Sequence, residues 1–495
     1  MTIIVDPIRT HAQAAPGRFA MGDAESGRRW TWAELDTAAD RLAAWLVDQL
    51  GPASASRVAV VARNHPLQIV LQFACARAGA IFVPLNWRLA VPELAVIMAD
   101  ADPALLFHDP GFALPDHRAK RRLLADLELL GEPGARAGDA ARLGWDAPMT
   151  LLYTSGTSGK PKGVIVTEAN AFWGNTNFNL GNAVSPASVF LCDMPLFHTA
   201  GLFAAVRAPL LAGAVVWISA GFEPVKTIAR IADHSLGITH YFSVPQMAAT
   251  LWQHPDFAPE KFQQLAVYAT GGAPNPRAQV ERFVRAGIAM SDGFGMSETG
   301  SNFTMPVGDP DLLVAKAGSC GLPFVAVQLR IAHQCGAALP PGETGELWLK
   351  GPSITPGYWN QPALTAQAFA AGWFKTGDAA MQDADGFTFI VDRRKDMFIS
   401  GGENVYPAEI EAVLAELPGL AQSAVIGVAD GRWGEVGKAF LVLTAGSELT
   451  TAQAYSHCLM RLAKFKVPAT FVIVASLPST ASGKVQKHLL RDAAG

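Results

Sequence analysis

The first third of the chain alternates helical periodicity with short apolar runs. Residues Trp32–Leu50 carry apolar side chains at spacings of three and four, which predicts an amphipathic helix. Runs of Val, Ile, Leu and Phe at residues 58–61 and 80–83 predict buried strands. Strands that alternate with helices pack as a sheet covered by helices, so this pattern predicts an α/β fold.

The length of the chain requires more than one core. A single hydrophobic core stops growing by roughly 250–300 residues, and this chain has 495. The charged run DRRKD at residues 392–396 precedes the pair Gly401 and Gly402, which is typical of an exposed connection between domains. We therefore expect a large N-terminal α/β domain with layered sheets and helices over residues 1–394, and a small, mobile α+β domain over residues 395–495.

Two further segments carry local predictions. Pro407 can begin a helix because the first turn needs no N–H there, and an apolar stripe follows it at residues 410–417. The polar stretch at residues 115–145 is expected to form a surface helix with loops. In the smaller domain a helix is expected at residues 451–464, and strands are expected at residues 424–428, 439–443 and 470–474.

Composition excludes several classes of protein. Half of the residues are apolar and 17% are charged, as in a globular chain, and a net charge of −4 argues against a nucleic-acid surface. Five scattered cysteines without CxxC or His-paired spacing indicate neither disulfides nor zinc. The uncharged apolar run at residues 208–222 contains a proline and glycines and is too short to span a membrane, and the N-terminus lacks the core of a signal peptide. A soluble, cytoplasmic protein is expected.

The segment LLYTSGTSGKPKGV at residues 151–164 combines glycines, hydroxyl side chains and lysines directly after a predicted strand. Glycines let backbone N–H groups converge on an anion, hydroxyls donate further hydrogen bonds, and lysine neutralises charge. It is not a Walker A loop, because two residues separate Gly156 from Gly159 and Pro161 follows Lys160. A surface turn can share this composition, but such a long stretch after a buried strand favours a polyphosphate site.

This segment resembles the signature of the adenylate-forming superfamily, which includes acyl-CoA synthetases, nonribosomal peptide adenylation domains and luciferases. The likeness covers nearly the whole chain, and it is nearest to bacterial feruloyl- or coumarate-type and fatty acyl-CoA synthetases. It implies an AMP-forming ligase whose cofactors and substrates are ATP, Mg²⁺, coenzyme A and a carboxylic acid. Six more motifs carry it: MPLFH (194–198), ATGGAP (269–274), DGFGMSET (292–299), WFKTGD (373–378), DRRKDMFISGGENVYPAEIE (392–411) and PSTASGKVQK (478–487).

The resemblance assigns a nucleotide site. Lys162 is expected at the phosphates, Phe294 against the adenine, and Ser297 at the α-phosphate. Asp378 and Arg393 are expected at the ribose. The remaining residues that the motifs assign to ATP or AMP are Thr154, Ser155, Gly156, Thr157, Ser158, Gly159, Gly272, Ala273, Pro274, Asp292, Gly293, Gly295 and Met296.

Three residues are expected to be catalytic. Lys484 matches the lysine that contacts both the acid carboxylate and the α-phosphate, so it offsets charge as two anions meet. Glu298 is the expected Mg²⁺ ligand, because a carboxylate is a hard oxygen donor. His198 is expected to border the acid pocket and to gate the approach of the thiol. Without the motifs, each would be read as an ordinary loop or core residue.

The resemblance also implies a domain rotation between two half-reactions. Lys395 matches the hinge residue, and rotation is expected to bring Gly401, Gly402 and Glu403 to coenzyme A. The expected acid pocket is mostly apolar, which favours a monocarboxylic acid with an apolar body, of the aryl or cinnamic (feruloyl-like) type or a medium-chain fatty acid. Its residues are Phe197, Ala200, Gly201, Tyr241, Thr270 and Gly271.

Other functions stay open on sequence alone. A free-standing enzyme that loads an acyl group onto a carrier protein would share every motif. An inactive nucleotide-binding protein is disfavoured because Lys484, Glu298 and Asp378 are all present. A luciferase is disfavoured because the chain lacks an SKL ending. The expected partners are small molecules, with no nucleic acid, and a homodimer is left open.

Overall fold

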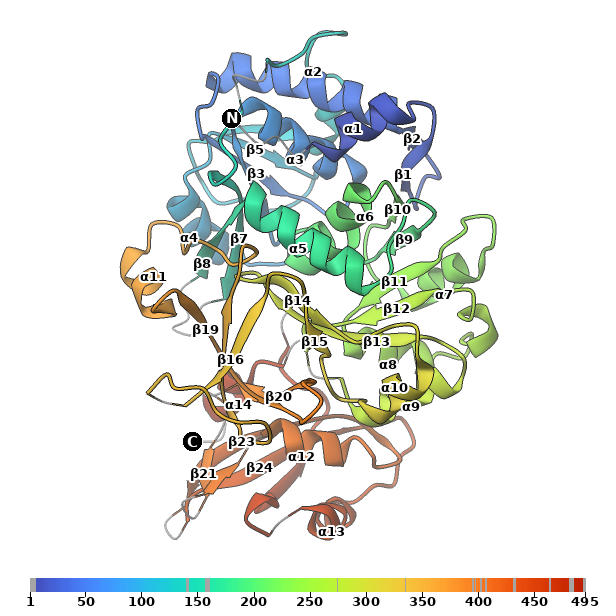
Figure 1. The fold of residues 1–495 in the computed structure, drawn as a ribbon, viewed down its shortest axis with the longest axis vertical. Coiled ribbons are helices and arrows are strands. Elements are labelled where there is room, and N and C mark those ends of the chain that lie inside the picture. The colour runs from blue at the N-terminus through green and yellow to red at the C-terminus, as the bar shows by residue number, and fades with distance from the viewer. Residues whose placement is uncertain are drawn as a thin grey trace.

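The computed structural model describes residues 6–138, 142–155, 161–273, 275–333, 335–393, 396, 398–400, 403–405, 407–430, 433–462, 464–479 and 485–492. For residues 155, 392, 393, 399, 403, 404, 465 and 488 it describes the backbone alone. Figure 1 shows the N-terminal elements at one end of the molecule and the C-terminal elements at the other, with the segments of residues 290–390 between them.

Two large sheets form the N-terminal part of the described chain. The first has the strand order β15 (Leu322–Pro323), β14 (Gly300–Thr304), β13 (Met290–Met296), β12 (Val267–Thr270), β11 (His240–Ser243), β9 (Val189–Cys192), β10 (Val215–Ile218), β1 (Phe19–Asp23) and β2 (Arg29–Thr31). The second has the order β6 (Lys120–Leu123), β5 (Leu105–His108), β3 (Arg57–Val61), β4 (Ile81–Leu85), β7 (Pro148–Ser155) and β8 (Pro161–Thr167). Both are parallel at their centres and antiparallel at an edge.

Two smaller sheets follow in the described part of the chain. One has the order β16 (Gln328–Ala332), β17 (Gly345–Lys350), β19 (Trp373–Gln382) and β18 (Phe369–Ala370), and β20 (Thr388–Arg393) also pairs with β19. The last has the order β22 (Glu403–Val405), β21 (Phe398–Ser400), β24 (Gly434–Leu443) and β23 (Leu420–Asp430), with β25 (Thr470–Ile473) beside β24.

Helices cover these sheets, which gives the layered α/β architecture that the sequence predicted (Figure 1). None of the described helices is both long and apolar enough to cross a membrane. The α-helices are α1 (Pro7–Ala14), α2 (Trp32–Leu50), α3 (Pro66–Ala78), α4 (Val91–Ala101), α5 (Glu168–Gly181), α6 (Ala208–Leu211), α7 (Pro224–Ala232), α8 (Pro245–Gln253), α9 (Arg277–Arg285), α10 (Pro310–Ala315), α11 (Pro362–Ala368), α12 (Pro407–Leu414), α13 (Thr451–Arg461) and α14 (Lys487–Asp492).

Local sequence explains where the helices begin and end. Thr31 caps α2 by accepting from the N–H of Glu34 at 3.3 Å, while the Glu34 carboxylate accepts from the N–H of Thr31 at 2.7 Å. Helix α3 ends at Gly79, whose φ of +70° is the left-handed conformation that glycine adopts without strain. The helix predicted at Trp32–Leu50 is confirmed to the residue.

The predicted strands are confirmed with shifted ends, but one prediction is wrong. Residues 115–145 were expected to form a surface helix, whereas the described part holds the exposed edge strand β6 and a short 3₁₀ helix, Leu124–Glu128. The basic run at residues 120–122 has no helical apolar stripe to bury. It pairs instead with β5 and places charged side chains on the sheet edge, where charge opposes edge-to-edge association.

The last sheet has a core of its own. Ile410 and Leu414 on α12 pack with Val425 on β23 and Leu441 on β24 in one apolar cluster, which confirms the predicted helix at Pro407. Strand β20 belongs to the preceding sheet, and β21 begins the last one at Phe398. The predicted boundary between residues 394 and 395 falls between these strands but lies outside the described residues, and it remains a prediction.

A buried ion cluster ties the N-terminal helix α1 to α2 and α3. The Arg77 side chain is only 2% exposed, and its guanidinium donates to Asp6 at 2.9 and 3.1 Å, to Asp40 at 2.8 Å and to Asp36 at 2.6 Å. Arg142 also donates to Asp6. Burial raises the pKa of the Asp6 carboxyl, but the two guanidinium groups lower it further, to about 2.

We expect Asp6→Asn to reduce the free energy of unfolding at pH 7 by about 3 kcal/mol, because it leaves a buried guanidinium with one charged partner fewer. The folded-state pKa lies below the ordinary value of 3.8, so the carboxylate stabilises the fold above about pH 4. This contribution is lost as the pH falls to about 2. Thermal unfolding of both proteins from pH 7 to pH 2 should show a gap that closes at the acid end.

The exposed ion pair between Glu223 and Lys226 provides the control. Glu223→Gln should change the melting temperature little, because exposed ion pairs contribute about 0–1 kcal/mol. A gap between Asp6→Asn and the parent protein that stays constant down to pH 2 would contradict the ion cluster as its cause.

Candidate active site

The phosphate segment lies in the hairpin of β7 and β8 at the edge of the six-stranded sheet. Thr154 on β7 pairs directly with Lys162 on β8, so the last residues of one strand and the first of the next are neighbours. Gly156, Thr157, Ser158 and Gly159 lie outside the described residues, and only the backbone of Ser155 is described. The two flanks confirm that the segment follows a strand directly, as the sequence predicted.

A buried carboxylate stands next to this hairpin. Glu298 is 6% exposed and comes from the turn between β13 and β14. The Nζ of Lys162 lies 3.9 Å from its Oε1, and the Tyr358 hydroxyl donates to the same oxygen at 3.0 Å. The Lys162 ammonium also lies 4.7 Å from the centre of the Tyr358 ring, within the range of a cation–π contact.

Tyr358 is a residue of this candidate site that the sequence analysis missed. It lies 60 positions from Glu298, and nothing in local spacing indicates that the two side chains meet. Burial and the neighbouring Glu298 carboxylate raise the pKa of the Tyr358 hydroxyl, so at neutral pH it remains a hydrogen-bond donor. The hydroxyl therefore holds one carboxylate oxygen in place and leaves the other for a cation.

The backbone is closely packed at the end of β13 and in the turn that follows it, a segment from Gly293 to Gly300 that we call the glycine turn. A Cβ on Gly293 would stand 2.8 Å from the Phe303 carbonyl oxygen, and one on Gly295 would stand 2.5 Å from the Gly300 carbonyl oxygen. Only glycine lets β13 and β14 approach so closely. Phe294, between the two glycines, lies edge-on to Phe303 with ring centres 5.8 Å apart.

Asp292 lies at the base of this turn and is buried. Its Oδ1 accepts from the Thr270 hydroxyl at 2.9 Å, and the hydroxyl oxygen of Thr270 accepts in turn from the Asn275 amide at 3.0 Å. Burial raises the pKa of Asp292 to about 8, and the Thr270 bond opposes this only in part. The carboxyl group is therefore mostly protonated at pH 7.

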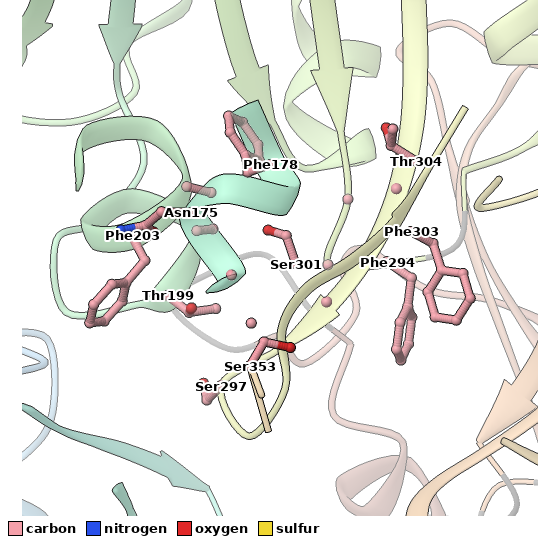
Figure 2. A pocket seen from close by; sticks show the side chains of 18 of the residues that line it. Asn175, Phe178, Thr199, Phe203, Phe294, Ser297, Ser301, Phe303, Thr304 and Ser353 are labelled. Carbon is pink, nitrogen blue, oxygen red and sulfur yellow. The ribbon is translucent and has the colours of Figure 1, made fainter. Parts of the chain in front are cut away.

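A cavity, part of it open to solvent, adjoins the glycine turn. Its walls come from α5, from the π-helix Ala200–Arg207, from β11 to β14, and from a segment around Ser353. Figure 2 shows Thr199 and Phe203 on one side of the cavity and Phe294, Phe303 and Thr304 on the other. Among the described residues that line it, none has an ionisable side chain.

Three of the six predicted acid-pocket residues line this cavity, namely Ala200, Thr270 and Gly271. Phe197, Gly201 and Tyr241 do not line it, and the assignment of all six to the acid pocket remains a prediction. Tyr241 lies on the opposite face of β11, where its hydroxyl donates to the buried Asp193 at 3.1 Å. Because side chains alternate along a strand, the next residue, Phe242, faces the cavity instead.

Local packing explains why Gly201 and Phe197 do not line the cavity. A Cβ on Gly201 would stand 2.2 Å from the Pro195 carbonyl oxygen, so this glycine is covered by backbone and not by the cavity. Phe197 is 5% exposed, and its ring packs against the His198 ring with centres 4.6 Å apart.

His198 immediately precedes Thr199 and Ala200, which line the cavity, but is not itself a lining residue. Burial, with a smaller contribution from Arg88, lowers the pKa of its imidazole to about 4. The ring is therefore neutral at pH 7. A gating role for His198 remains a prediction.

The other predicted nucleotide residues fall in different places. Gly272, with a φ of +81°, lines the cavity together with Gly293, Phe294, Gly295 and Ser297. Three others do not line it. Ala273 is exposed, and the N–H of Met296 donates to Thr299. Asp378 is 6% exposed, and its backbone lies opposite that of Arg393 where β19 pairs with β20. Pro274, Lys395, Gly401, Gly402 and Lys484 lie outside the described residues, and the side chains of Arg393 and Glu403 are not described.

The residues present fit a magnesium-bound nucleotide better than a resident metal. Within the described ranges, no group of three or more His, Cys, Asp or Glu side chains is placed to hold an ion. Glu298 offers one buried carboxylate beside the hairpin lysine. A single carboxylate suits Mg²⁺, which completes its coordination with water and substrate phosphates.

Comparison with known proteins identifies the class of protein. Residues 8–359 match the family of AMP-binding enzymes, and residues 409–484 match the AMP-binding enzyme C-terminal domain. The chain belongs to the AMP-binding enzyme family, since the first match alone covers most of its length. Its relatives place it among the acyl-CoA ligases of that family.

Two curated relatives cover almost the whole chain. A feruloyl-CoA synthase of Amycolatopsis sp. is 37% identical over 492 residues, which are 98% of this chain and 97% of the relative. An indoleacetate–CoA ligase of Aromatoleum aromaticum is 35% identical over 503 residues, covering 98% of this chain and 96% of the relative.

Solved structures match the fold over nearly the whole chain. The o-succinylbenzoate CoA synthetase of Bacillus subtilis in complex with its acyl-adenylate intermediate superposes with a TM-score of 0.89 at 30% identity, covering 99% of both chains. The same enzyme in complex with ATP and a magnesium ion gives a TM-score of 0.86 at 30% identity, covering 98% of both chains.

Tyr358→Phe should raise the Mg²⁺ concentration that gives half-maximal pyrophosphate release by roughly tenfold, because a hydrogen bond to a charged group contributes about 1.5–3 kcal/mol. The rate at saturating Mg²⁺ should fall less. Tyr241→Phe is the matched control, since that hydroxyl also donates to a buried carboxylate but lies on the face of β11 that points away from the cavity. Equal Mg²⁺ titration curves for Tyr358→Phe and Tyr241→Phe would argue against a positioning role for Tyr358.

Asp292→Asn should make the melting temperature less dependent on pH. The folded-state pKa of about 8 lies above the ordinary 3.8, so from about pH 4 to 8 the carboxyl ionises in the unfolded chain but stays protonated in the fold, and the free energy of unfolding falls as the pH rises. An amide cannot ionise, so the variant should gain on the parent protein across this window. Thermal unfolding at pH 5, 6, 7 and 8 measures the difference, and parallel curves would refute a neutral Asp292.

Proposed function

We propose that this acyl-CoA ligase joins a monocarboxylic acid with an apolar, aryl-type body to coenzyme A in two steps that share one site. A carboxylate oxygen first attacks the α-phosphate of ATP, and pyrophosphate leaves. The thiolate of coenzyme A then attacks the acyl carbon, and AMP leaves. A carboxylate is a poor electrophile, and the intermediate anhydride removes that obstacle.

The observation that carries this proposal is the uncharged cavity beside the glycine turn. No lysine, arginine or histidine stands among its described lining residues to meet a second carboxylate, so a dicarboxylic acid would bury an unpaired charge. Phe178, Phe203 and Phe242 offer ring surfaces instead. The names of the feruloyl and indoleacetate relatives, both aryl acids, point the same way.

In the first step, charge neutralisation is the main task. Lys162 approaches the phosphates from the hairpin, and Lys484 offsets charge between the carboxylate and the α-phosphate. Glu298 would hold Mg²⁺, which would supply further positive charge at the phosphates. Ser297 donates to the α-phosphate, Phe294 covers the adenine, and Asp378 accepts from the ribose hydroxyls.

In the second step, the domain of residues 395–495 rotates against residues 1–394 about Lys395. This removes Lys484 from the site and brings Gly401, Gly402 and Glu403 to the pantetheine arm. His198 controls the approach of the thiol. Its ring is neutral at pH 7, so it adds no positive charge that would retain the leaving AMP.

The acceptor needs a direct test, because a carrier protein's phosphopantetheine arm ends in the same thiol. Pyrophosphate release and thioester formation should be measured with a panel of aryl, medium-chain and dicarboxylic acids, each with free coenzyme A and with a holo carrier protein. We expect aryl monocarboxylic acids and free coenzyme A to give kcat/KM at least tenfold above the other combinations. A preference for a dicarboxylic acid, or for the carrier protein, would overturn the proposal.

Two substitutions should impair opposite half-reactions. Lys484→Ala removes a cation needed only while carboxylate meets phosphate, so acid-dependent ATP–pyrophosphate exchange should fall by about 10²-fold or more, while thioester formation from supplied acyl-adenylate survives. Lys395→Pro fixes φ at the hinge, so exchange should persist while transfer to coenzyme A collapses. Loss of the same half-reaction in both variants would exclude the rotating-domain mechanism.

A further inference from the structure

One face of α5 forms a wall of the cavity along its whole length. The lining residues on this helix recur at spacings of three and four, as a single helical face requires: Asn170, Ala171, Gly174, Asn175, Phe178 and, at its C-terminal cap, Asn182. Gly174 packs against Gly300, at the level of the glycine turn. Asn182 lies eight residues further along, about 12 Å by the rise of a helix, and therefore stands far from the nucleotide residues.

Asn182 carries a hydrogen-bond acceptor without a partner. The side chain is 3% exposed and lines the cavity, and its Oδ1 accepts no hydrogen bond from any described residue. Its Nδ2 donates to the Phe178 carbonyl at 2.9 Å, which fixes the amide orientation, because a flipped amide would set two oxygens against each other. What distinguishes Asn182 is its place on the cavity lining, where a donor on a bound molecule can meet this acceptor.

The surroundings of Asn182 are aromatic and uncharged. Phe178, Phe242 and Phe324 line the same cavity. The His240 Nε2 donates to the Asn182 backbone carbonyl at 3.0 Å, and the Thr239 hydroxyl lies 2.8 Å from the other ring nitrogen. Burial lowers the pKa of this imidazole to about 4, so the ring is neutral at pH 7. A neutral donor at the end of an apolar body suits this place, whereas an ammonium or a carboxylate does not.

We propose that Asn182 is a specificity-determining residue whose Oδ1 accepts a hydrogen bond from a hydroxyl group at the far end of the acid, as in a para-hydroxylated aryl acid. The proposal rests on the ligase function argued above and names the class of acid within it. The apolar body lies between the aromatic side chains, with the carboxylate at the glycine turn and the hydroxyl at Asn182. An acid without the hydroxyl leaves the buried acceptor unmet, and it binds more weakly for that reason.

The test compares matched pairs of acids that differ only in the terminal hydroxyl. One pair is 4-hydroxycinnamate and cinnamate, and the other is 8-hydroxyoctanoate and octanoate. ATP–pyrophosphate exchange gives kcat/KM for each acid without involving the thiol acceptor. We expect the parent protein to prefer the hydroxylated member of the pair it accepts by roughly 10- to 100-fold.

Asn182→Leu should remove this preference, and Asn179→Leu is its matched control. Asn179 lies on the same helix, its Nδ2 also donates to a carbonyl, and its Oδ1 also has no partner among the described residues, but it does not line the cavity. Each ratio is measured within one protein, so a loss of folded enzyme cancels. We expect Asn179→Leu to retain the preference and Asn182→Leu to bring it near one.

The outcomes separate the two proposals. Exchange with both members of a pair at equal kcat/KM, or an unchanged ratio in Asn182→Leu, would overturn the hydroxyl subsite and leave the ligase function intact. A hydroxyl preference confined to the octanoate pair would retain the subsite and refute the aryl body. Failure of all four acids to support exchange would overturn the proposed acid class, and the subsite with it.

Discussion

The carboxylate of Glu298 joins three separately built parts of the molecule. It follows a strand of the nine-stranded sheet, Lys162 reaches it from the six-stranded sheet, and Tyr358 reaches it from the segment after β17. A buried carboxylate needs such partners, because transfer of an unpaired charge into the interior is costly. The requirement works in both directions. The two sheets must pack so that Lys162 reaches the Glu298 carboxylate, and this packing brings the hairpin of β7 and β8 to the edge of the cavity.

The sequence was most informative where a local pattern decides the structure. Periodicity predicted α2 to the residue, because a capping box and an apolar stripe agree there. The phosphate segment and the glycine turn were recognisable because backbone close to an anion or to a second strand demands glycine. Motif likeness assigned Thr270 and Gly271 to the acid pocket and Ser297 to the nucleotide site, and in the structure all three line one cavity, although they come from different strands and turns.

The misses share a different cause. Tyr358 contacts Glu298, which lies 60 positions away in the chain, and it does not stand in a segment whose local composition is unusual. The sequence could not show that Tyr241 faces away from this cavity, because a buried four-residue strand, HYFS, has no polar alternation to indicate which side chains face it. The edge strand β6 was taken for a helix because its basic residues have no apolar periodicity of either kind.

The face of α5 that lines the cavity places its residues at successive depths along the space for a bound acid. Each lining residue stands at a depth set by the helical rise of 1.5 Å, so positions 171 to 182 mark about 16 Å in steps of one turn. A side chain enlarged near position 174 would exclude all but the shortest acids, and one enlarged near position 182 would exclude only the longest. Relatives with the same adenylating residues can therefore differ in the length of the acid that they accept through single substitutions on one helix. The chemistry at the other end of the helix is not disturbed.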